Sequence, residues 1–256
     1  MKSLLAALVV FFTFTPSMFC MPDRIIIIRH GEGIYDKKAN LEIGPCLSKK
    51  GIIRAIAFMR YYIEVLNKNQ VIPLPDYIFA ANPYNAEGKY CSPSSIRHLQ
   101  TVAPFVTWMY ETHPEKASQY LLDIPYVPTQ YKELAKYIVT ENHLDGKTIL
   151  ICWTHRFIMK LINDIIMDSG YSLITDEPIK MTDFVLNNQT DSGYTLESSL
   201  TLLKWENDDF DKVIFLDFNN KEKSVDMKIM KDCYPVPETN EGQSQLTEWF
   251  YSQFPQ

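Results

Sequence analysis

Residues 25–32 read IIIIRHGE, and the predicted fold is built around them. Such a short run of β-branched apolar residues predicts a strand that is buried on both faces, as in a parallel sheet covered by helices. Arg29, His30 and Gly31 follow where this strand is expected to end. In open α/β sheets the ligand crevice lies beyond the carboxyl ends of the strands. The sequence therefore predicts an imidazole and a positive charge at the mouth of a binding site.

Two more apolar runs, residues 77–81 and 148–153, predict further buried strands. Between and after the strands, apolar residues at helical spacing predict four helices. Their expected bounds are 48–67, 94–109, 131–139 and 157–167. Strands that alternate with helices in this way require right-handed parallel crossovers. The expected fold is an α/β three-layer sandwich, with a mostly parallel sheet and helices on both faces.

The C-terminal part departs from this alternation. Residues 200–205 and 213–218 are apolar and flank a short acidic turn, which predicts an antiparallel hairpin. Apolar residues at helical spacing within 246–254 predict a terminal helix that docks on the domain. Residues 33–45 and 174–198 are polar or irregular, and we expect them to be loops.

The first 20 residues have the composition of a secretory signal peptide. Met1 and Lys2 give a short basic start, and residues 4–14 form an apolar run that is too short to span a bilayer comfortably. We therefore expect a secreted or periplasmic protein that loses residues 1–20 and has no membrane contact afterwards. Residues 21–256 are expected to form a single domain. The alternatives are an uncleaved membrane anchor and a lipid-modified Cys20.

The composition narrows the range of partners. The 256 residues are 46% hydrophobic, enough for a sizeable core, and the net charge of −6 argues against nucleic acid as the main partner. Four cysteines follow residue 20, and in an oxidising compartment they allow three disulfide pairings. These cysteines are Cys46, Cys91, Cys152 and Cys233. Cys152 lies inside a predicted strand and is expected to be a buried thiol.

Two predicted strands each end in a histidine next to an arginine, namely Arg29-His30 and His155-Arg156. A third arginine, Arg97, is expected in the first turns of a helix. Arginine forks match phosphoryl oxygens, a helix N-terminus adds backbone donors, and a neutral imidazole can attack phosphorus. Because both strands are expected to end at the same edge of one sheet, the pattern predicts a phosphoryl-transfer site. The histidines that lack such a setting are expected to be surface or hydrogen-bonded residues: His98, His113 and His143.

The sequence Arg29-His30-Gly31-Glu32 resembles the signature of the histidine phosphatase superfamily, the phosphoglycerate-mutase-like enzymes, in the branch with an Arg-His-Gly motif. Further segments resemble, in order, the start of its first helix, its second arginine motif, its second histidine strand and the closing hairpin of a small bacterial-type subgroup. These segments are residues 47–55, 95–104, 146–155 and 205–218.

The resemblance implies a phosphatase that hydrolyses phosphomonoesters through a phosphohistidine. His30 would be the nucleophile, Arg29 and Arg97 would bind the phosphoryl oxygens, and His155 would stabilise charge in the transition state. The implied substrate-binding residues are Arg29, Arg97, Ser95 and Arg156. The implied partner is a small phosphorylated substrate, with no metal ion and no organic cofactor.

The sequence departs from the family pattern where a general acid is expected. Arg156 follows the second histidine, where one branch has glycine and the other has the aspartate that acts as the acid. Thr154 stands where the subgroup has glutamate. The remaining acid candidates are Asp123, Glu133 and Glu32, and the sequence does not choose among them. Since a missing acid slows the release of poor leaving groups, the alternative is a weak or inactive pseudo-phosphatase that binds phosphorylated ligands or a protein partner.

Overall fold

The structure is a computed structural model, and it describes the chain in several ranges. These are residues 21–36, 41–68, 72–84, 95–114, 122–124, 126–174, 205 and 209–254. The predicted signal peptide, residues 175–198 of the predicted loop 174–198, Cys91 and the predicted strand 200–205 apart from Trp205 lie outside the described residues, and Ile174 ends a strand.

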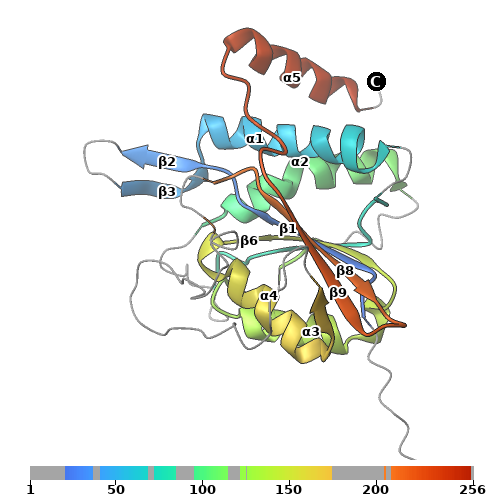
Figure 1. The fold of residues 1–256 in the computed structure, drawn as a ribbon. Helices are drawn as coiled ribbons and strands as arrows, with labels where there is room; N and C mark the ends of the chain where they lie inside the picture. Colours follow the sequence, from blue (N-terminus) through green and yellow to red (C-terminus); the bar gives the residue numbers. More distant parts are fainter. Residues whose placement is uncertain are drawn as a thin grey trace, which may run out of the picture.

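Seven strands form one sheet in the order β5-β4-β6-β1-β8-β9-β7, and helices cover both of its faces (Figure 1). The strands are β1 (Arg24–Arg29), β4 (Tyr77–Ala80), β5 (Leu122–Asp123), β6 (Thr148–Trp153), β7 (Ser172–Ile174), β8 (Val213–Asn219) and β9 (Ser224–Met230). The helices are α1 (Lys49–Tyr61), α2 (Arg97–Thr112), α3 (Tyr131–Thr140), α4 (His155–Ser169) and α5 (Asn240–Ser252), with short helical turns at Tyr62–Leu66 and Asn142–Leu144.

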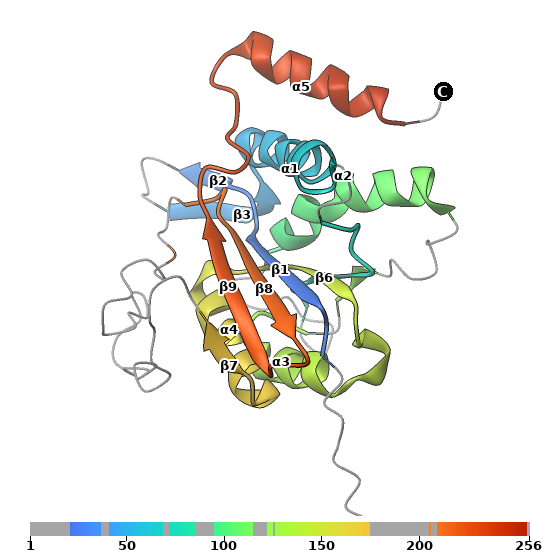
Figure 2. The same ribbon diagram turned by 45° about the vertical axis from the view of Figure 1, so that its right-hand side comes forward.

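Strand β1 lies between a parallel neighbour, β6, and an antiparallel neighbour, β8 (Figure 2). Its four isoleucines are 0% exposed. Because side chains alternate along a strand, Ile25 and Ile27 pack in the cluster under α3 and α4, whereas Ile26 and Ile28 pack in the cluster under α1 and α2. The prediction of a strand buried on both faces is therefore confirmed.

The helices form two layers. Helices α1 and α2 lie on one side of the sheet, α3 and α4 lie on the other, and α5 lies outside α1 (Figure 1). Four of the six strand pairings in the sheet are parallel, and β8 forms antiparallel pairs with β1 and β9. The mostly parallel three-layer sandwich with a C-terminal antiparallel hairpin is thus confirmed.

Two local predictions are wrong. The hairpin partner of β8 is β9, which comes after it in the chain, and Trp205 is not part of a strand. Residues 33–45, predicted as a loop, contain β2 (Gly33–Asp36) and most of β3 (Leu41–Leu47), which pair antiparallel as a separate two-stranded sheet. Gly44 and Pro45 interrupt the alternation of β3, which is why the sequence pattern favoured a loop.

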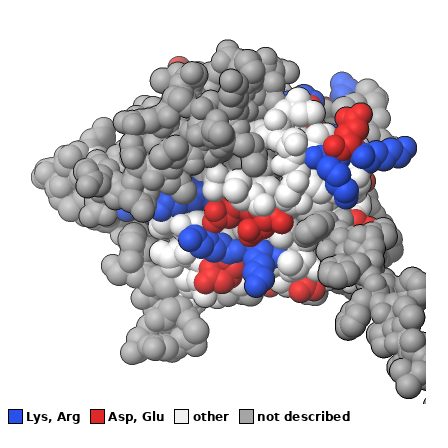
Figure 3. Space-filling model, turned by 60° about the horizontal axis from the view of Figure 1, so that its bottom comes forward, with Lys and Arg blue, Asp and Glu red and all other residues white. Residues whose placement is uncertain are grey.

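The described surface carries charges of both signs. On the face shown in Figure 3, basic side chains lie directly beside acidic ones. Ion pairs of this kind on the sheet include Arg24 with Asp217 and Lys228 with Asp226. Among the described residues, no helix combines the length and the apolar character that a membrane crossing requires.

Candidate active site

The two histidine-bearing strands end side by side. Arg29, the last residue of β1, is in register with Trp153, the last residue of β6. The His30 N–H donates to the Trp153 carbonyl oxygen at 3.4 Å. His155 begins α4 two residues later and is partly exposed, and Arg156 beside it is exposed. The structure therefore brings both histidine motifs to one edge of the sheet, as the sequence predicted.

A hydroxyl ties helix α2 to the loop after β1. Thr101 Oγ1 accepts a hydrogen bond from the Gly31 N–H at 2.9 Å and donates to the Arg97 carbonyl oxygen at 2.7 Å. Arg97 is the first residue of α2 and is buried. This contact brings Arg97 to the histidine edge of the sheet.

Ser95 holds the Arg97 side chain. The Ser95 Oγ accepts hydrogen bonds from Arg97 Nε at 2.6 Å and from the Arg97 backbone N–H at 3.2 Å. It lies 3.5 Å from the Pro45 carbonyl oxygen, to which it donates. Ser95, predicted as a substrate-binding residue, thus lies in the site, and in this structure its hydroxyl orients the arginine.

The His30 imidazole is held in one tautomer. Its Nδ1 lies 2.8 Å from the Gly31 carbonyl oxygen, and a carbonyl can only accept, so Nδ1 carries the proton. The pKa of His30 lies well below its ordinary value because burial disfavours the cation, and because His98, Arg97 and Arg29 add positive charge nearby. The ring is therefore neutral at ordinary pH and keeps a lone pair on Nε2.

Phe210 lies across Arg29. The Arg29 guanidinium carbon is 3.8 Å from the centre of the Phe210 ring, a stacking distance for a cation–π contact. Arg29 Nη1 also donates to the Asp209 carbonyl oxygen at 3.3 Å, and Trp205 Nε1 donates to the same oxygen at 2.6 Å. The Phe210 ring centre is 6.5 Å from that of His30. Residues 209–210, which are distant from Arg29 in the sequence, therefore orient its guanidinium group.

Glu32, one of the three acid candidates, is already engaged. Its carboxylate accepts two hydrogen bonds from Arg54, at 2.8 Å from Nε and 2.6 Å from Nη2. Burial alone raises the pKa of Glu32, but the hydrogen bonds and charge of Arg54 outweigh it and hold this pKa below its ordinary value. Glu32 is thus an ionised structural partner of Arg54, which makes it a poor proton donor.

Asp123 lies on the α3 face of the sheet. It is in register with Phe79, which packs against Tyr137 of α3. Burial raises the pKa of Asp123, while a backbone hydrogen bond and the charge of His143 lower it. Glu133 is in the first turn of the same helix, α3. Neither carboxylate is among the groups whose charge shifts the pKa of His30.

His98 is a site residue that the sequence prediction missed. It is 2% exposed, and its ring meets the His30 ring edge to face, with 4.8 Å between centres and 83° between planes. Burial lowers the pKa of His98 to about 3. We expected a surface or hydrogen-bonded residue, but His98 is buried, and among the described residues only its Nδ1 has a hydrogen-bond partner, the Ser95 carbonyl oxygen. The signal was present, because positions 98, 102, 105 and 109 follow the helical period of the buried face of α2.

The cysteines and other potential metal ligands lie apart from one another in the described ranges. Cys46, Cys152 and Cys233 are free thiols, and Cys152 is fully buried, as expected. Within the described residues, no group of histidine, cysteine, aspartate and glutamate side chains has the geometry to hold a metal ion.

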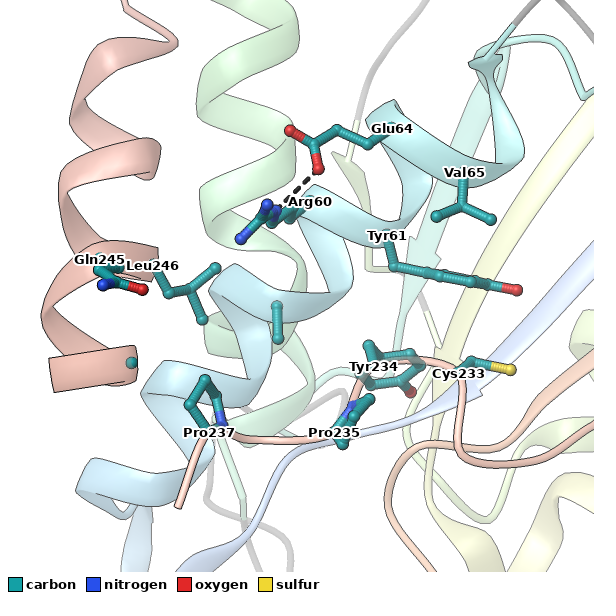
Figure 4. Close-up of a pocket in the computed structure, with 12 residues that line it drawn as sticks. Arg60, Tyr61, Glu64, Val65, Cys233, Tyr234, Pro235, Pro237, Gln245 and Leu246 are labelled. Atoms are coloured by element: carbon teal, nitrogen blue, oxygen red, sulfur yellow. Dashed lines mark hydrogen bonds and ion pairs between the residues drawn. The ribbon is translucent and has the colours of Figure 1, made fainter. Parts of the chain in front are cut away.

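A separate cavity of about 330 Å³ lies between α1 and α5 (Figure 4). Its walls come from α1, the segment 233–237 and α5, and the Arg60–Glu64 ion pair lies on its rim. None of the twelve lining residues is a predicted site residue. This cavity is therefore distinct from the histidine edge of the sheet.

No protein-family profile and no curated protein sequence matches the chain. Similar solved structures include SixA, a candidate phosphohistidine phosphatase from Agrobacterium tumefaciens, at 14% identity and a TM-score of 0.32, over 59% of this chain and 82% of that one. The protein histidine phosphatase SixA complexed with tungstate is similar at 12% identity and a TM-score of 0.36, over 82% of this chain and 97% of that one. Mycobacterial hydrolase 2 is similar at 10% identity and a TM-score of 0.38, over 89% of this chain and 97% of that one. At these identities and TM-scores, the case for a function rests on the site itself.

Proposed function

We propose that this protein is a phosphatase that hydrolyses phosphomonoesters through a phosphohistidine at His30. The observation that carries the proposal is the fixed, neutral imidazole of His30, with its proton on Nδ1 and two arginines close by. A neutral imidazole nitrogen is a competent nucleophile, and arginines match the charge of a phosphoryl group. Export directed by residues 1–20 is part of this proposal and would appear as a mature chain that lacks them.

The proposed reaction has two steps. The Nε2 lone pair of His30 forms a bond to phosphorus while the bond to the leaving oxygen breaks, and that oxygen takes the electron pair and a proton from the bound ester or from water. Water then attacks phosphorus, the N–P bond breaks, and inorganic phosphate leaves with His30 neutral again. Arg29 and Arg97 would stabilise the phosphoryl oxygens, and His155 at the start of α4 would face the transferring group. The arginines supply the positive charge, so we propose that no metal ion is needed.

The test compares wild type with His30→Ala on an aryl phosphate. We expect a loss of at least about 10³-fold in kcat, as for other nucleophile removals. Rapid quenching with labelled substrate should trap an acid-labile phosphoprotein in wild type alone. His143→Ala is the control, because His143 lies beside Tyr77 and Tyr137 away from the site. Full activity of His30→Ala would refute the proposal.

The second candidate function is a pseudo-phosphatase that binds phosphorylated ligands or a protein partner without turnover. The ion pair between Glu32 and Arg54 favours it, because it removes one candidate acid. This candidate predicts that phosphate or vanadate raises thermal stability while no phosphohistidine accumulates. The rapid-quench experiment therefore separates the two functions.

A further inference from the structure

His98 is a buried residue of the site to which the proposed reaction gives no role. Its ring packs edge to face on that of the proposed nucleophile, His30. Its Nδ1 lies 3.3 Å from the Ser95 carbonyl oxygen, and since a carbonyl can only accept, Nδ1 carries the ring proton. The other nitrogen, Nε2, therefore presents a lone pair, and His98 acts there as a hydrogen-bond acceptor.

That acceptor has no partner in the described part of the chain, although Nε2 is fully buried. A buried polar atom without a hydrogen bond is costly, and native proteins satisfy nearly all of them. The ring that carries this atom packs against the His30 ring, with 4.8 Å between centres, and Arg29 and Arg97 are close enough for their charges to act on it. An unsatisfied buried acceptor next to two arginines favours an anion that also carries a hydrogen-bond donor.

The charges around His98 indicate which kind of group can donate to its Nε2. Among the described residues, the titratable and charged groups that act on it are Arg29 at the end of β1, His30 directly after β1, and Arg97 from its own helix. Burial and these arginines disfavour the imidazolium, so His98 stays an acceptor at working pH. A lone pair repels the bare oxygens of a phosphoryl dianion, but it accepts a hydrogen bond from a phosphoryl oxygen that carries a proton.

We infer that the site binds the phosphoryl group as its monoanion, with the P–OH group donating to His98 Nε2 and the arginines holding the unprotonated oxygens. This inference rests on the proposed function and adds the ionic form of its substrate.

The chemistry then balances without a carboxylic acid from the protein. The monoester monoanion brings one proton, which goes to the leaving oxygen as the P–O bond breaks and the His30 Nε2–P bond forms. In the second step water supplies two hydrogens, and the phosphate monoanion leaves with both. This matches a site in which Glu32 is held ionised by Arg54.

The test uses inorganic phosphate and sulfate as probes, with the complete mature protein at about pH 5.5, where phosphate is mainly the monoanion and sulfate carries no proton. Calorimetric titration should give at least about tenfold tighter binding of phosphate, although sulfate has the larger charge. His98→Phe keeps a ring of similar size but removes the acceptor, and should bind both anions about equally. His143→Phe is the matched control and should keep the preference.

Three outcomes overturn the inference: equal binding of both anions by wild type, a preference that persists in His98→Phe, or no binding of phosphate. The wild-type comparison alone decides the matter should His98→Phe fail to fold. The proposed function has a separate readout, since a phosphohistidine can form on His30 whether or not the site prefers the monoanion. Equal anion binding together with a trapped phosphohistidine would refute the inference and leave the phosphatase standing.

Discussion

Gly51 lies in the first turn of α1, directly against the backbone of Glu32. A Cβ atom added at Gly51 would overlap the Glu32 carbonyl oxygen. One added at Gly31 would lie 2.9 Å from the Gly51 carbonyl oxygen. The same turn is closed by Ser48, whose Oγ accepts from the Gly51 N–H at 3.1 Å and donates to the Glu32 carbonyl oxygen at 3.2 Å. Two glycines thus let the loop after His30 rest on α1.

Gly51→Ala should therefore disturb the loop that carries His30. Because backbone atoms must move, we expect a loss of about 3 kcal/mol in the free energy of unfolding, together with a loss of phosphatase activity. Chemical denaturation and an aryl phosphate assay measure the two effects. Gly146→Ala is the control, because nothing lies within 4 Å of its added Cβ and only its positive φ of 67° is unfavourable. It should cost about 1 kcal/mol and keep activity. A fully stable and active Gly51→Ala would contradict this account of the loop.

The sequence predicted the site residues correctly where reactive side chains directly follow a predicted strand. His30 and Arg29 end a run of isoleucines, and a motif that needs both residues at a strand end leaves few alternatives. His98 belongs to no motif, whereas its neighbour Arg97 is part of a pattern that predicts phosphate binding. Its burial follows from the geometry of α2, because it shares a helix face with Val102 and Phe105. The role of Ser95 as a support for Arg97 depends on side-chain contacts that no spacing encodes.

At the scale of elements, α5 is an additional layer outside the sandwich. It packs on α1, and Leu246 is its one buried residue among those described, at 3% exposed. Trp249 Nε1 adds a hydrogen bond to Glu64 of the adjoining helical turn at 2.7 Å. The α5 helix therefore docks through Leu246 and the partly buried rings of Trp249 and Phe250, next to the cavity of Figure 4, which Leu246 also lines.

Leu246→Ala should loosen this helix without changing the active site. Removing the buried methyl groups is expected to cost about 2–3 kcal/mol in the free energy of unfolding, with kcat on an aryl phosphate unchanged. Tyr251→Ala is the matched control in α5, since Tyr251 is 69% exposed and should change stability by less than about 0.5 kcal/mol. Equal effects of the two substitutions would mean that α5 does not dock through Leu246.

The strands that the sequence predicted well are those with a continuous run of apolar residues. Between their end residues, strands β1, β4 and β6 are apolar and buried, because helices cover both faces of the sheet. Strand β9 was missed although Val225, Met227 and Ile229 alternate with more polar residues, because the acidic turn before β8 gave a competing hairpin partner. Burial on a single face gives a weaker signal than burial on two.

At the scale of the whole molecule, one ionic network joins distant parts of the chain. Arg54 of α1 binds Glu32 after β1, and its Nη1 lies 3.2 Å from Asp211 Oδ2 before β8 and 3.4 Å from the Tyr234 carbonyl oxygen after β9. The Arg54 side chain is almost fully buried. Losing one partner would leave this charge poorly compensated, which is expensive in a buried setting.

This network predicts how stability depends on pH. The pKa of Glu32 is lower in the folded protein than in the unfolded chain, so its contribution is present above the unfolded pKa and is lost as the pH falls through the folded pKa. Glu32→Gln should therefore be about 3 kcal/mol less stable than wild type at neutral pH, and this difference should shrink below about pH 4. Denaturant titrations at several pH values measure it.

Asp226→Asn is the control for that experiment. Asp226 pairs with Lys228 on the surface, where both side chains are well exposed, so its effect should stay within about 0.5 kcal/mol at every pH. A difference between Glu32→Gln and wild type that stays constant down to pH 3 would show that the carboxylate charge does not stabilise the fold.

The central position of β1 also affects the order of folding. The strand that leads into His30 is among the first described segments of the chain, yet residues 24–29 pair with residues 148–153 on one side and residues 24–28 with residues 213–217 on the other. Closing such long loops costs chain entropy before the contacts between the strands can offset that cost. Folding of this topology is therefore slow. During synthesis β1 must wait, unpaired and highly apolar, until most of the chain has been made. The strand that organises the native protein is thus also an aggregation hazard during synthesis.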